Sequence, residues 1–194
     1  MLQRVCVFCG SSPGHDPRFR EVAQDVGRTL AEAGLELVYG GGRIGLMGAV
    51  AEAALAAGGR VTGIIPEALD RREVGFRELS EFIVVDSMHE RKRLMAERSD
   101  AFVALPGGFG TFEEFCEIVT WSQLGMHAKP CILLNAHGYY DPMVAMFDRA
   151  HAEGFVREAH RRIVVTLGEP AELLAALHAY EAPVTDRWLT GAQT

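Results

Sequence analysis

The residues with the clearest chemistry are PGGFGTFEE at residues 106–114. The glycines in this segment can adopt positive φ angles and leave backbone N–H groups free to converge on an anion. Thr111 stands at the expected start of a helix, whose N-terminus favours negative charge. No Lys-Ser/Thr pair follows, as a Walker loop requires. The segment therefore predicts a site for a single phosphate, with two carboxylates just beyond it.

Those two carboxylates, Glu113 and Glu114, have alternative roles. Thr111-x-x-Glu114 matches a capping box, in which the Glu114 side chain accepts the backbone N–H of Thr111. In the other interpretation, Glu114 faces the ligand and takes part in catalysis. The two glutamates diverge by about 100° around a helix, so one of them can cap while the other faces the ligand. The residues alone leave both assignments open.

A second informative segment is MHERKRLM at residues 88–95. Helical spacing places Met88, Arg91 and Met95 on one face, with Lys92 beside them. A guanidinium on a largely apolar face needs a partner, because an unpaired buried charge is costly. Arg91 therefore either snorkels or pairs with a structural carboxylate, or it points into a cleft towards ligand oxygens or Glu114.

Short apolar runs alternate with helical segments along the whole chain. We expect strands at residues 4–8, 36–39, 60–65, 82–85, 101–105, 131–135 and 163–166. We expect helices at residues 17–33, 46–57, 88–98, 111–124, 140–153 and 170–180. This alternation predicts an α/β fold with a doubly wound, mostly parallel sheet and helices on both faces. The charged, irregular residues 66–80 are predicted to form the longest loop.

Three glycine-rich loops follow expected strands, at residues 9–14, 40–45 and 106–110. In a doubly wound sheet, ligands bind outside the carboxyl ends of the strands. Because the three loops converge on that edge, we expect the backbone there to contact the ligand, at Gly10, Ser11, Gly41, Gly42 and Gly107.

GGGRIG at residues 40–45 also matches the dinucleotide fingerprint G-x-G-x-x-G. An NAD-dependent oxidoreductase is therefore one alternative. That fingerprint needs an acidic residue about twenty positions later for the ribose hydroxyls. The first acid in that region is Glu67, which lies beyond the expected strand, so the match indicates backbone close to a nucleotide and not NAD in particular.

The chain has 194 residues, the length of one ordinary domain. We expect residues 1–182 to form a single nucleotide-binding α/β domain and residues 183–194 to form a loose C-terminal tail. The formal net charge of −7 disfavours nucleic acid or an anionic membrane as a partner. No segment resembles a secretory signal or a transmembrane span, so a cytoplasmic location is expected.

Neither a metal nor an organic cofactor is expected. The seven histidines form no H-E-x-x-H motif or ligand cluster. CVFC at residues 6–9 lies in an expected strand, where positions three apart face opposite sides, so these cysteines are expected to pack. The two lysines, Lys92 and Lys129, offer little for a pyridoxal Schiff base, and Lys129 is expected at the surface.

The helix expected at residues 111–124 is apolar on several sides. A helix that is apolar most of the way round is usually buried. In a domain of this size, a subunit interface is a reasonable way to cover the outer face of such a helix. The chain is therefore expected to form a homodimer.

Together these motifs resemble the Lonely guy (LOG) family of cytokinin riboside 5′-monophosphate phosphoribohydrolases, which are often mislabelled lysine decarboxylases. The resemblance runs over residues 5–180, and residues 106–114 fit the family signature P-G-G-x-G-T-x-x-E. Further matching segments are CGSS at 9–12, YGGG at 39–42, GLMG at 45–48, MHERK at 88–92 and TWSQLG at 120–125.

The resemblance implies a Rossmann-like dimer that cleaves the N-glycosidic bond of an adenine nucleoside 5′-monophosphate, yielding free base and ribose 5-phosphate. It implies catalytic roles for Arg91 and Glu114. It also implies nucleotide contacts from a larger set of positions: Glu73, Met88, Arg91, Lys92, Gly108, Phe109, Gly110, Thr111, Phe112, Glu113, Glu114 and Thr120.

In this interpretation the phosphate binds at residues 107–111 and the ribose lies within reach of Glu114. The carboxylate would stabilise an oxocarbenium-like sugar, or orient or deprotonate the attacking water. Arg91 is expected to keep Glu114 ionised, because a nearby cation lowers the pKa of a carboxylate. A nucleotide or cofactor carrier without turnover shares the fold and the glycine loops, and is the second alternative.

Overall fold

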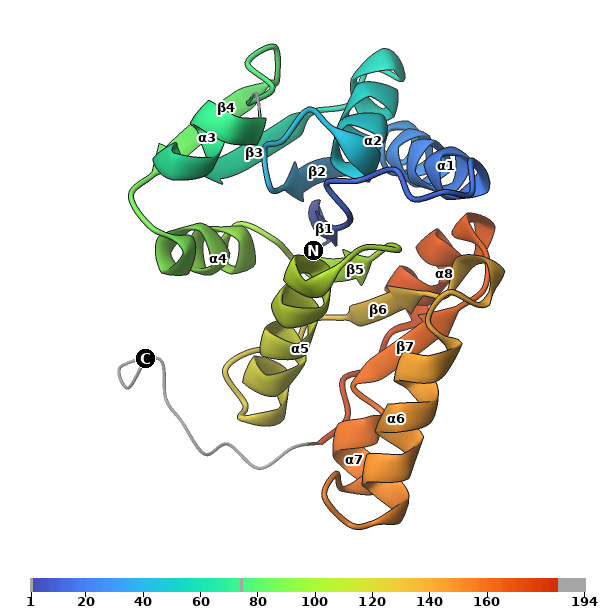
Figure 1. Ribbon diagram of the computed structural model, residues 1–194. Helices are drawn as coiled ribbons and strands as arrows, with labels where there is room; N and C mark the ends of the chain where they lie inside the picture. The colour runs from blue at the N-terminus through green and yellow to red at the C-terminus, as the bar shows by residue number, and fades with distance from the viewer. Residues whose placement is uncertain (1, 74, 185–194) are drawn as a thin grey trace.

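A computed structural model of the chain describes residues 2–73 and 75–184, with the side chains of residues 71–73 outside that description. The described strands form one sheet of seven strands in the order β4-β3-β2-β1-β5-β6-β7 (Figure 1). Every neighbouring pair of strands is parallel. The strands are β1 (Arg4–Phe8), β2 (Glu36–Tyr39), β3 (Val61–Pro66), β4 (Glu81–Val85), β5 (Ala101–Ala104), β6 (Cys131–Leu134) and β7 (Val164–Leu167).

Helices cover both faces of this sheet. Their bounds are α1 (Arg18–Glu32), α2 (Gly45–Ala56), α3 (Glu67–Glu73), α4 (Met88–Glu97), α5 (Phe109–Gln123), α6 (Asp141–Ala152), α7 (Glu158–Arg161) and α8 (Leu173–Ala179). Two 3-10 turns, η1 (Ala136–Gly138) and η2 (Pro170–Glu172), precede α6 and α8. One apolar cluster joins the sheet to α1, α2 and α8, and a second joins its other face to α4, α5 and α6.

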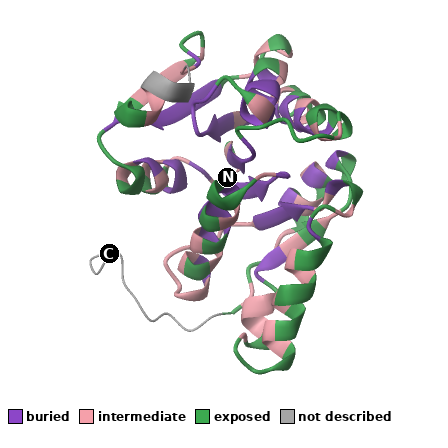
Figure 2. Cartoon of the chain, in the orientation of Figure 1, coloured by how far each residue is buried: buried purple, intermediate pink, exposed green. Residues whose placement is uncertain are grey.

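The central strand β1 shows why the apolar runs are continuous. Val5 and Val7 belong to the first cluster, whereas Cys6 and Phe8 belong to the second. A parallel strand covered on both faces has no polar side to present to water. The five inner strands are accordingly buried, whereas the edge strands β4 and β7 are only partly covered and the outer sides of the helices are exposed (Figure 2).

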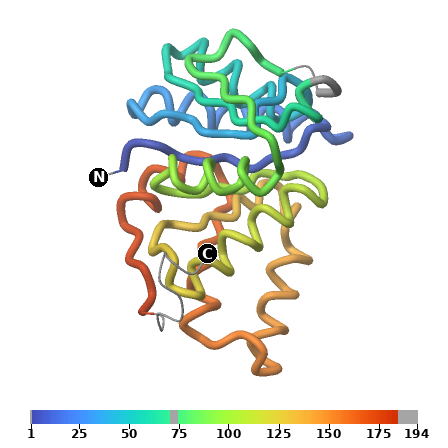
Figure 3. Tube along the Cα trace, turned by 90° about the vertical axis from the view of Figure 1, so that its left-hand side faces the viewer, coloured from blue at the N-terminus to red at the C-terminus, as the bar shows by residue number. Residues whose placement is uncertain are grey.

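The strand order places the first half of the chain at one end of the sheet and the second half at the other (Figure 3). The direction of winding reverses between β1 and β5, because α1 after β1 and α5 after β5 pack on opposite faces of the sheet. In open α/β sheets, ligands bind at such a switch point, outside the carboxyl ends of the strands. The fold therefore opens a ligand site between the first and third predicted glycine loops.

The predicted fold class is confirmed, since the sheet is doubly wound and its described strand pairs are all parallel. The prediction of a loop over residues 66–80 was wrong in its first half, because α3 follows β3 directly. Glu67 and Asp70 stand in its first turn, where acidic side chains stabilise a helix N-terminus. A helix of only seven residues is too short to produce a readable apolar period.

Most other bounds differ from prediction by one residue, and three helices differ by more. Helix α5 begins at Phe109, two residues before the expected start. The short helix α7 was not predicted, and the last expected helix divides into η2 and α8. Of the predicted tail, residues 185–194 lie outside the described residues. Within the described part of the chain, no helix is long and apolar enough to cross a lipid bilayer.

Candidate active site

The guanidinium of Arg91 is buried at the carboxyl ends of β2 and β3. Its Nε donates to the carbonyl oxygen of Ile64 at 3.1 Å, and its Nη2 donates to the carbonyl oxygen of Gly40 at 3.0 Å. The third nitrogen, Nη1, lies 3.6 Å from Oε1 of Glu114. The side chain is 8% exposed, so these partners replace water around the cation. Helix α4 thus supplies an arginine whose orientation is fixed on two sides by backbone.

Glu114 is the partner that α5 contributes. Its side chain is 10% exposed, and burial raises its pKa above the ordinary value. Arg91 opposes that rise without reversing it, and the nearby Glu113 adds to it. Arg91 lowers the pKa of Glu114, as expected of a nearby cation, but the desolvation of the buried carboxylate outweighs this effect, so the pKa is raised overall.

The alternative of a capping box at Thr111 is also wrong. The N-cap of α5 is Gly108, which places Thr111 one turn inside the helix. Glu114 points into the protein towards Arg91. The side chain of Thr111 is buried close to the Cα of Gly107, so a side chain at position 107 would collide with it. The glycine is therefore required for the close approach of the loop to the helix.

In the part of the chain that the structure describes, the N-terminus of α5 has no side-chain cap, since its N-cap residue is Gly108. Gly108, Phe109 and Gly110 are exposed, and Phe109 is 89% exposed. The first N–H groups of a helix lack intrahelical partners, and the helix dipole favours an anion there. This end of α5 is therefore open to a phosphate, one turn before the buried Glu114.

Glu113 pairs with Lys92, the neighbour of Arg91 on α4. The Nζ of Lys92 lies 2.6 Å from Oε1 of Glu113 and 2.9 Å from Oε1 of Glu117. Burial lowers the pKa of Lys92, but the hydrogen bonds that its ammonium donates to both carboxylates raise it overall. Lys92 is thus held as a cation beside the Arg91–Glu114 pair. Glu117 was missed by the sequence analysis, although its i,i+4 spacing from Glu113 is a readable signal.

The glycine loops divide into two groups. Gly10 donates its N–H to the carbonyl of Pro106 at 3.1 Å, which joins the loops after β1 and β5. A pocket between these loops is lined by Gly10, Ser11, Ser12, Pro13, Gly14, Phe19, Leu46, Pro106, Gly107, Gly108 and Tyr139. The hydroxyl of Tyr139 donates to the carbonyl of Gly107, a contact that the sequence did not indicate.

Gly41 and Gly42 lie elsewhere. Both are buried, and the carbonyl of Gly41 accepts the N–H of Phe76 at 3.1 Å. Gly42 forms an isolated antiparallel bridge with Gly75. Gly41 and Gly42 in the loop after β2 are therefore paired with the segment after α3, and they do not line the pocket between the β1 and β5 loops.

The remaining predicted site residues are less closely gathered. Met88 is exposed at the start of α4, and its sulfur lies 3.8 Å from Nη1 of Arg91. Phe112 is half-buried. Thr120 lies on the exposed side of α5, and its hydroxyl donates to the carbonyl of Cys116. The side chain of Glu73 lies outside the described residues.

Other groups carry no comparable arrangement. Among the described residues, no cluster of His, Cys, Asp or Glu has the arrangement of a metal site. Cys6 and Cys9 face opposite sides of the sheet, and burial raises the pKa of both thiols. Lys129 is half-buried and donates to the carbonyl of Ala96, which corrects its expected surface position.

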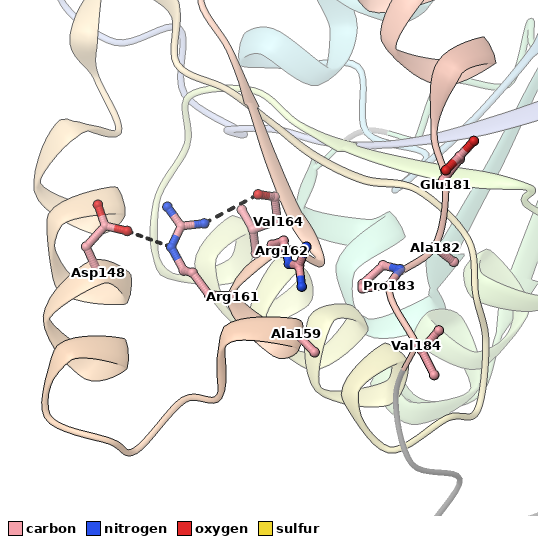
Figure 4. Close-up of a pocket in the computed structure, with 9 residues that line it drawn as sticks. All are labelled: Asp148, Ala159, Arg161, Arg162, Val164, Glu181, Ala182, Pro183 and Val184. Atoms are coloured by element: carbon pink, nitrogen blue, oxygen red, sulfur yellow. Dashed lines mark hydrogen bonds and ion pairs between the residues drawn. The ribbon is translucent and has the colours of Figure 1, made fainter.

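A separate hollow lies beside β7, at the far edge of the sheet from Arg91 (Figure 4). There Nε of Arg161 lies 2.7 Å from Oδ1 of Asp148, and its Nη1 donates to the carbonyl of Val164. Arg162 and residues 181–184 complete the lining. None of the predicted site residues reaches this hollow, so it is not part of the candidate active site.

A parallel, doubly wound sheet with a glycine-rich helix N-terminus beside a buried ion pair defines a Rossmann-like protein with a candidate anion site. The family model described as "Possible lysine decarboxylase" matches residues 47–177. The chain belongs to this family, and the resemblance to the LOG proteins is confirmed by its relatives.

Two relatives illustrate the match. The chain is 50% identical over 177 residues to "Probable cytokinin riboside 5'-monophosphate phosphoribohydrolase LOGL1" of Oryza sativa subsp. japonica, covering 91% of this chain and 79% of the relative. It is 47% identical over 179 residues to "Cytokinin riboside 5'-monophosphate phosphoribohydrolase LOG2" of Arabidopsis thaliana, covering 92% of this chain and 84% of the relative.

Among solved structures, the molybdenum cofactor carrier protein from Chlamydomonas reinhardtii superimposes with a TM-score of 0.69 at 21% identity. That match covers 92% of this chain and 97% of the carrier. The molybdenum cofactor binding protein of Rippkaea orientalis gives a TM-score of 0.71, also at 21% identity, over 92% of this chain and 97% of that protein. At such identity the likeness establishes the shared fold and nothing about the ligand.

Proposed function

We propose that this protein hydrolyses the N-glycosidic bond of cytokinin riboside 5′-monophosphates, releasing free base and ribose 5-phosphate. The observation that carries the proposal is the buried Arg91–Glu114 pair one turn behind an open, glycine-rich helix N-terminus. Relatives that are about half identical to the chain bear the name of this activity. AMP, which shares the ribose 5-phosphate, is a second substrate to test.

In the proposed complex, the phosphate binds the backbone N–H groups at residues 107–111 and the N-terminus of α5. This arrangement requires no side-chain cation, since the helix end itself favours an anion. The pocket between the β1 and β5 loops brings Gly10 and Ser11 to the same place. A phosphate fixed at this point leaves the ribose to extend along α5 towards Glu114.

The chemistry then falls to Glu114. As the base departs, positive charge develops on the sugar, and a fixed carboxylate stabilises that charge. The same carboxylate is placed to orient or deprotonate the attacking water. Its raised pKa makes it a stronger base than an exposed glutamate. Arg91 holds the carboxylate in place and offers Nη1 to oxygens of the ribose or phosphate.

Two other classes of protein are less well supported. A pyridoxal-dependent decarboxylase needs a neutral lysine, but Lys92 is held as a cation by Glu113 and Glu117. The second lysine, Lys129, donates to the end of α4, away from the carboxyl ends of the strands. A non-catalytic carrier shares this fold, but it has no need for a buried Arg91–Glu114 pair.

A product assay tests the proposal. The purified protein is incubated separately with isopentenyladenosine 5′-monophosphate and with AMP, and free base is measured by chromatography. Base release is expected, and the ratio of the two rates defines the preferred base. Nucleotide binding without any base release would contradict the proposal and favour the carrier.

We also propose that the protein is a homodimer. Within one chain, the side of α5 that carries Cys116 is exposed, and Phe112 and Val119 beside it are only partly covered. A second copy would cover this face. Light scattering at micromolar concentration is expected to give twice the mass of one chain. Cys116→Arg is expected to lower that mass, whereas the control Glu32→Arg on exposed α1 leaves it unchanged; a monomeric wild type would refute the dimer.

A cytoplasmic location is proposed as well. The four cysteines are free thiols, and three of them are buried. A reducing compartment preserves such thiols. Fractionation of cells that express the protein, with detection by antibody, tests this location.

A further inference from the structure

The orientation of Arg91 depends on a residue that has no side chain. Two carbonyl groups hold the guanidinium, and they come from the carboxyl ends of adjacent strands, at Gly40 after β2 and Ile64 within β3. Because Nε and Nη2 are both occupied, Nη1 is the nitrogen left to face Glu114. The planar guanidinium makes these three directions mutually dependent. Fixing the first two therefore fixes the third.

Gly40 is the position at which this arrangement is most sensitive. A Cβ at residue 40 would overlap Nη2 of Arg91, and it would lie 3.1 Å from Cζ of the same guanidinium. On its other side it would meet the sulfur of Met47 at 3.3 Å. The guanidinium lies against the carbonyl of Gly40 only because residue 40 lacks a side chain.

The requirement for glycine at residue 40 is not a matter of backbone conformation. Positive φ angles occur at Gly41 and Gly45 in this loop, but Gly40 is not among the glycines with positive φ. An alanine at residue 40 therefore meets no backbone strain of that kind. The alanine Cβ would displace the guanidinium of Arg91, which is the far end of a flexible side chain and can move at low cost to the fold. The substitution is therefore expected to change the position of Arg91 and to leave the backbone of the loop unchanged.

We propose that Gly40 is a positioning residue for the reaction, acting through Arg91 to align its Nη1 with the Glu114 carboxylate. The loop after β2, whose glycines otherwise match a dinucleotide fingerprint, thereby serves the catalytic pair and not a second nucleotide phosphate. Its carbonyl, not its N–H groups, is the functional group.

The variant Gly40→Ala tests this inference in two independent ways. First, a displaced guanidinium stabilises the Glu114 anion less, so the pKa of Glu114 is expected to rise above its wild-type value. This pKa is followed by NMR titration of protein with ¹³C-labelled glutamate carboxyls, with the signal assigned by its loss in Glu114→Gln. Other groups that act on Glu114 are common to all variants: Lys92 on α4, Glu113 and Glu117 on α5, and Cys6 and Cys9 at β1.

The matched control is the same substitution in an Arg91→Ala background. If Gly40 acts through Arg91, Gly40→Ala shifts the Glu114 titration only when the arginine is present. An equal shift in both backgrounds, or no shift in either, would overturn the inference. Should Gly40→Ala fail to fold, the double variant is expected to fold, since the colliding guanidinium is gone; failure of both would also overturn it.

Second, kcat for base release is expected to fall by about 100-fold in Gly40→Ala, with a much smaller change in KM, since a displacement of about 1 Å at a catalytic group has an effect of this order. This kinetic half rests on the proposed hydrolase function, whereas the titration does not. Absence of base release by wild type would therefore refute the function and leave the titration to decide on Gly40. A wild-type kcat in Gly40→Ala would refute its positioning role.

Discussion

Glu114→Gln is expected to lower kcat for base release by roughly 10²–10⁴-fold, the range of a lost general base or charge-stabilising carboxylate. The amide keeps the shape of the side chain but carries no negative charge to oppose the cationic sugar, and it accepts no proton from water. Substrate affinity is expected to persist, because the phosphate contacts at residues 107–111 do not involve this side chain. Product chromatography and a nucleotide-binding titration measure the two quantities separately.

The matched control is Glu113→Gln, one residue earlier on the same helix. Glu113 is exposed and its Oε1 lies 2.6 Å from Nζ of Lys92, whereas Glu114 is buried beside Arg91. Its replacement is expected to reduce kcat far less than that of Glu114. The reverse order of effects would mean that Glu113 faces the ribose and that the buried ion pair is structural.

The pH dependence of the wild type follows from the same carboxylate. Activity requires ionised Glu114, so kcat is expected to fall as the pH is lowered through its pKa. Burial raises that pKa, which places the acid limb above the ordinary glutamate value of about 4.3. A pH–rate profile measures this limb, and its midpoint at or below the ordinary value would contradict the assignment.

The sheet was predictable because its strands are short apolar runs that end in glycine-rich loops. Strand β1 is buried on both faces, so residues 5–8 are all apolar. This continuous apolar run distinguishes the strand from α1, in which polar and apolar residues alternate with helical spacing. Helix α3 was not predictable in this way, because only Ala68 and Leu69 among its seven residues are apolar, which is too few for an apolar stripe. The start of α5 was misplaced for a related reason. Thr111 has the residue type of an N-cap, but the adjacent glycines allow the helix to begin earlier.

Some features of the site could be predicted from the spacing of residues in the sequence, whereas others depend on the tertiary structure. Helical spacing indicated that Arg91 needs a buried partner, and Glu114 was one of the predicted candidates. The carbonyls of Gly40 and Ile64 were not predictable, since every residue has a carbonyl and only the register of β2, β3 and α4 selects two of them. The net rise in the pKa of Glu114 was not predicted, because the extent of its burial is a property of the packed fold.

Arg91→Lys preserves the charge of the site and tests whether its geometry matters. The guanidinium donates to two carbonyls and still presents Nη1 to Glu114. A lysine side chain is shorter and ends in a single ammonium group, so it cannot make all three contacts at once. If the ammonium donates to the two carbonyls, it lies too far from Glu114 to pair with it. If it pairs with Glu114, the two carbonyls lose their hydrogen-bond donors. We expect kcat to fall by about 100-fold, as for other misplaced catalytic groups.

Arg93→Lys is the control for Arg91→Lys. Arg93 lies two residues further along α4, on the exposed side, where it pairs with Glu97 at 2.7 Å. Steady-state kinetics on both variants are expected to show a large loss at residue 91 and a near-normal kcat at residue 93. If Arg91→Lys retained full activity, a cation of either shape would suffice, and the two backbone carbonyls would serve only to solvate a buried charge. A loss of kcat confined to Arg91→Lys would mean that the backbone carbonyls at the ends of β2 and β3 orient Nη1 of Arg91 towards the carboxylate of Glu114.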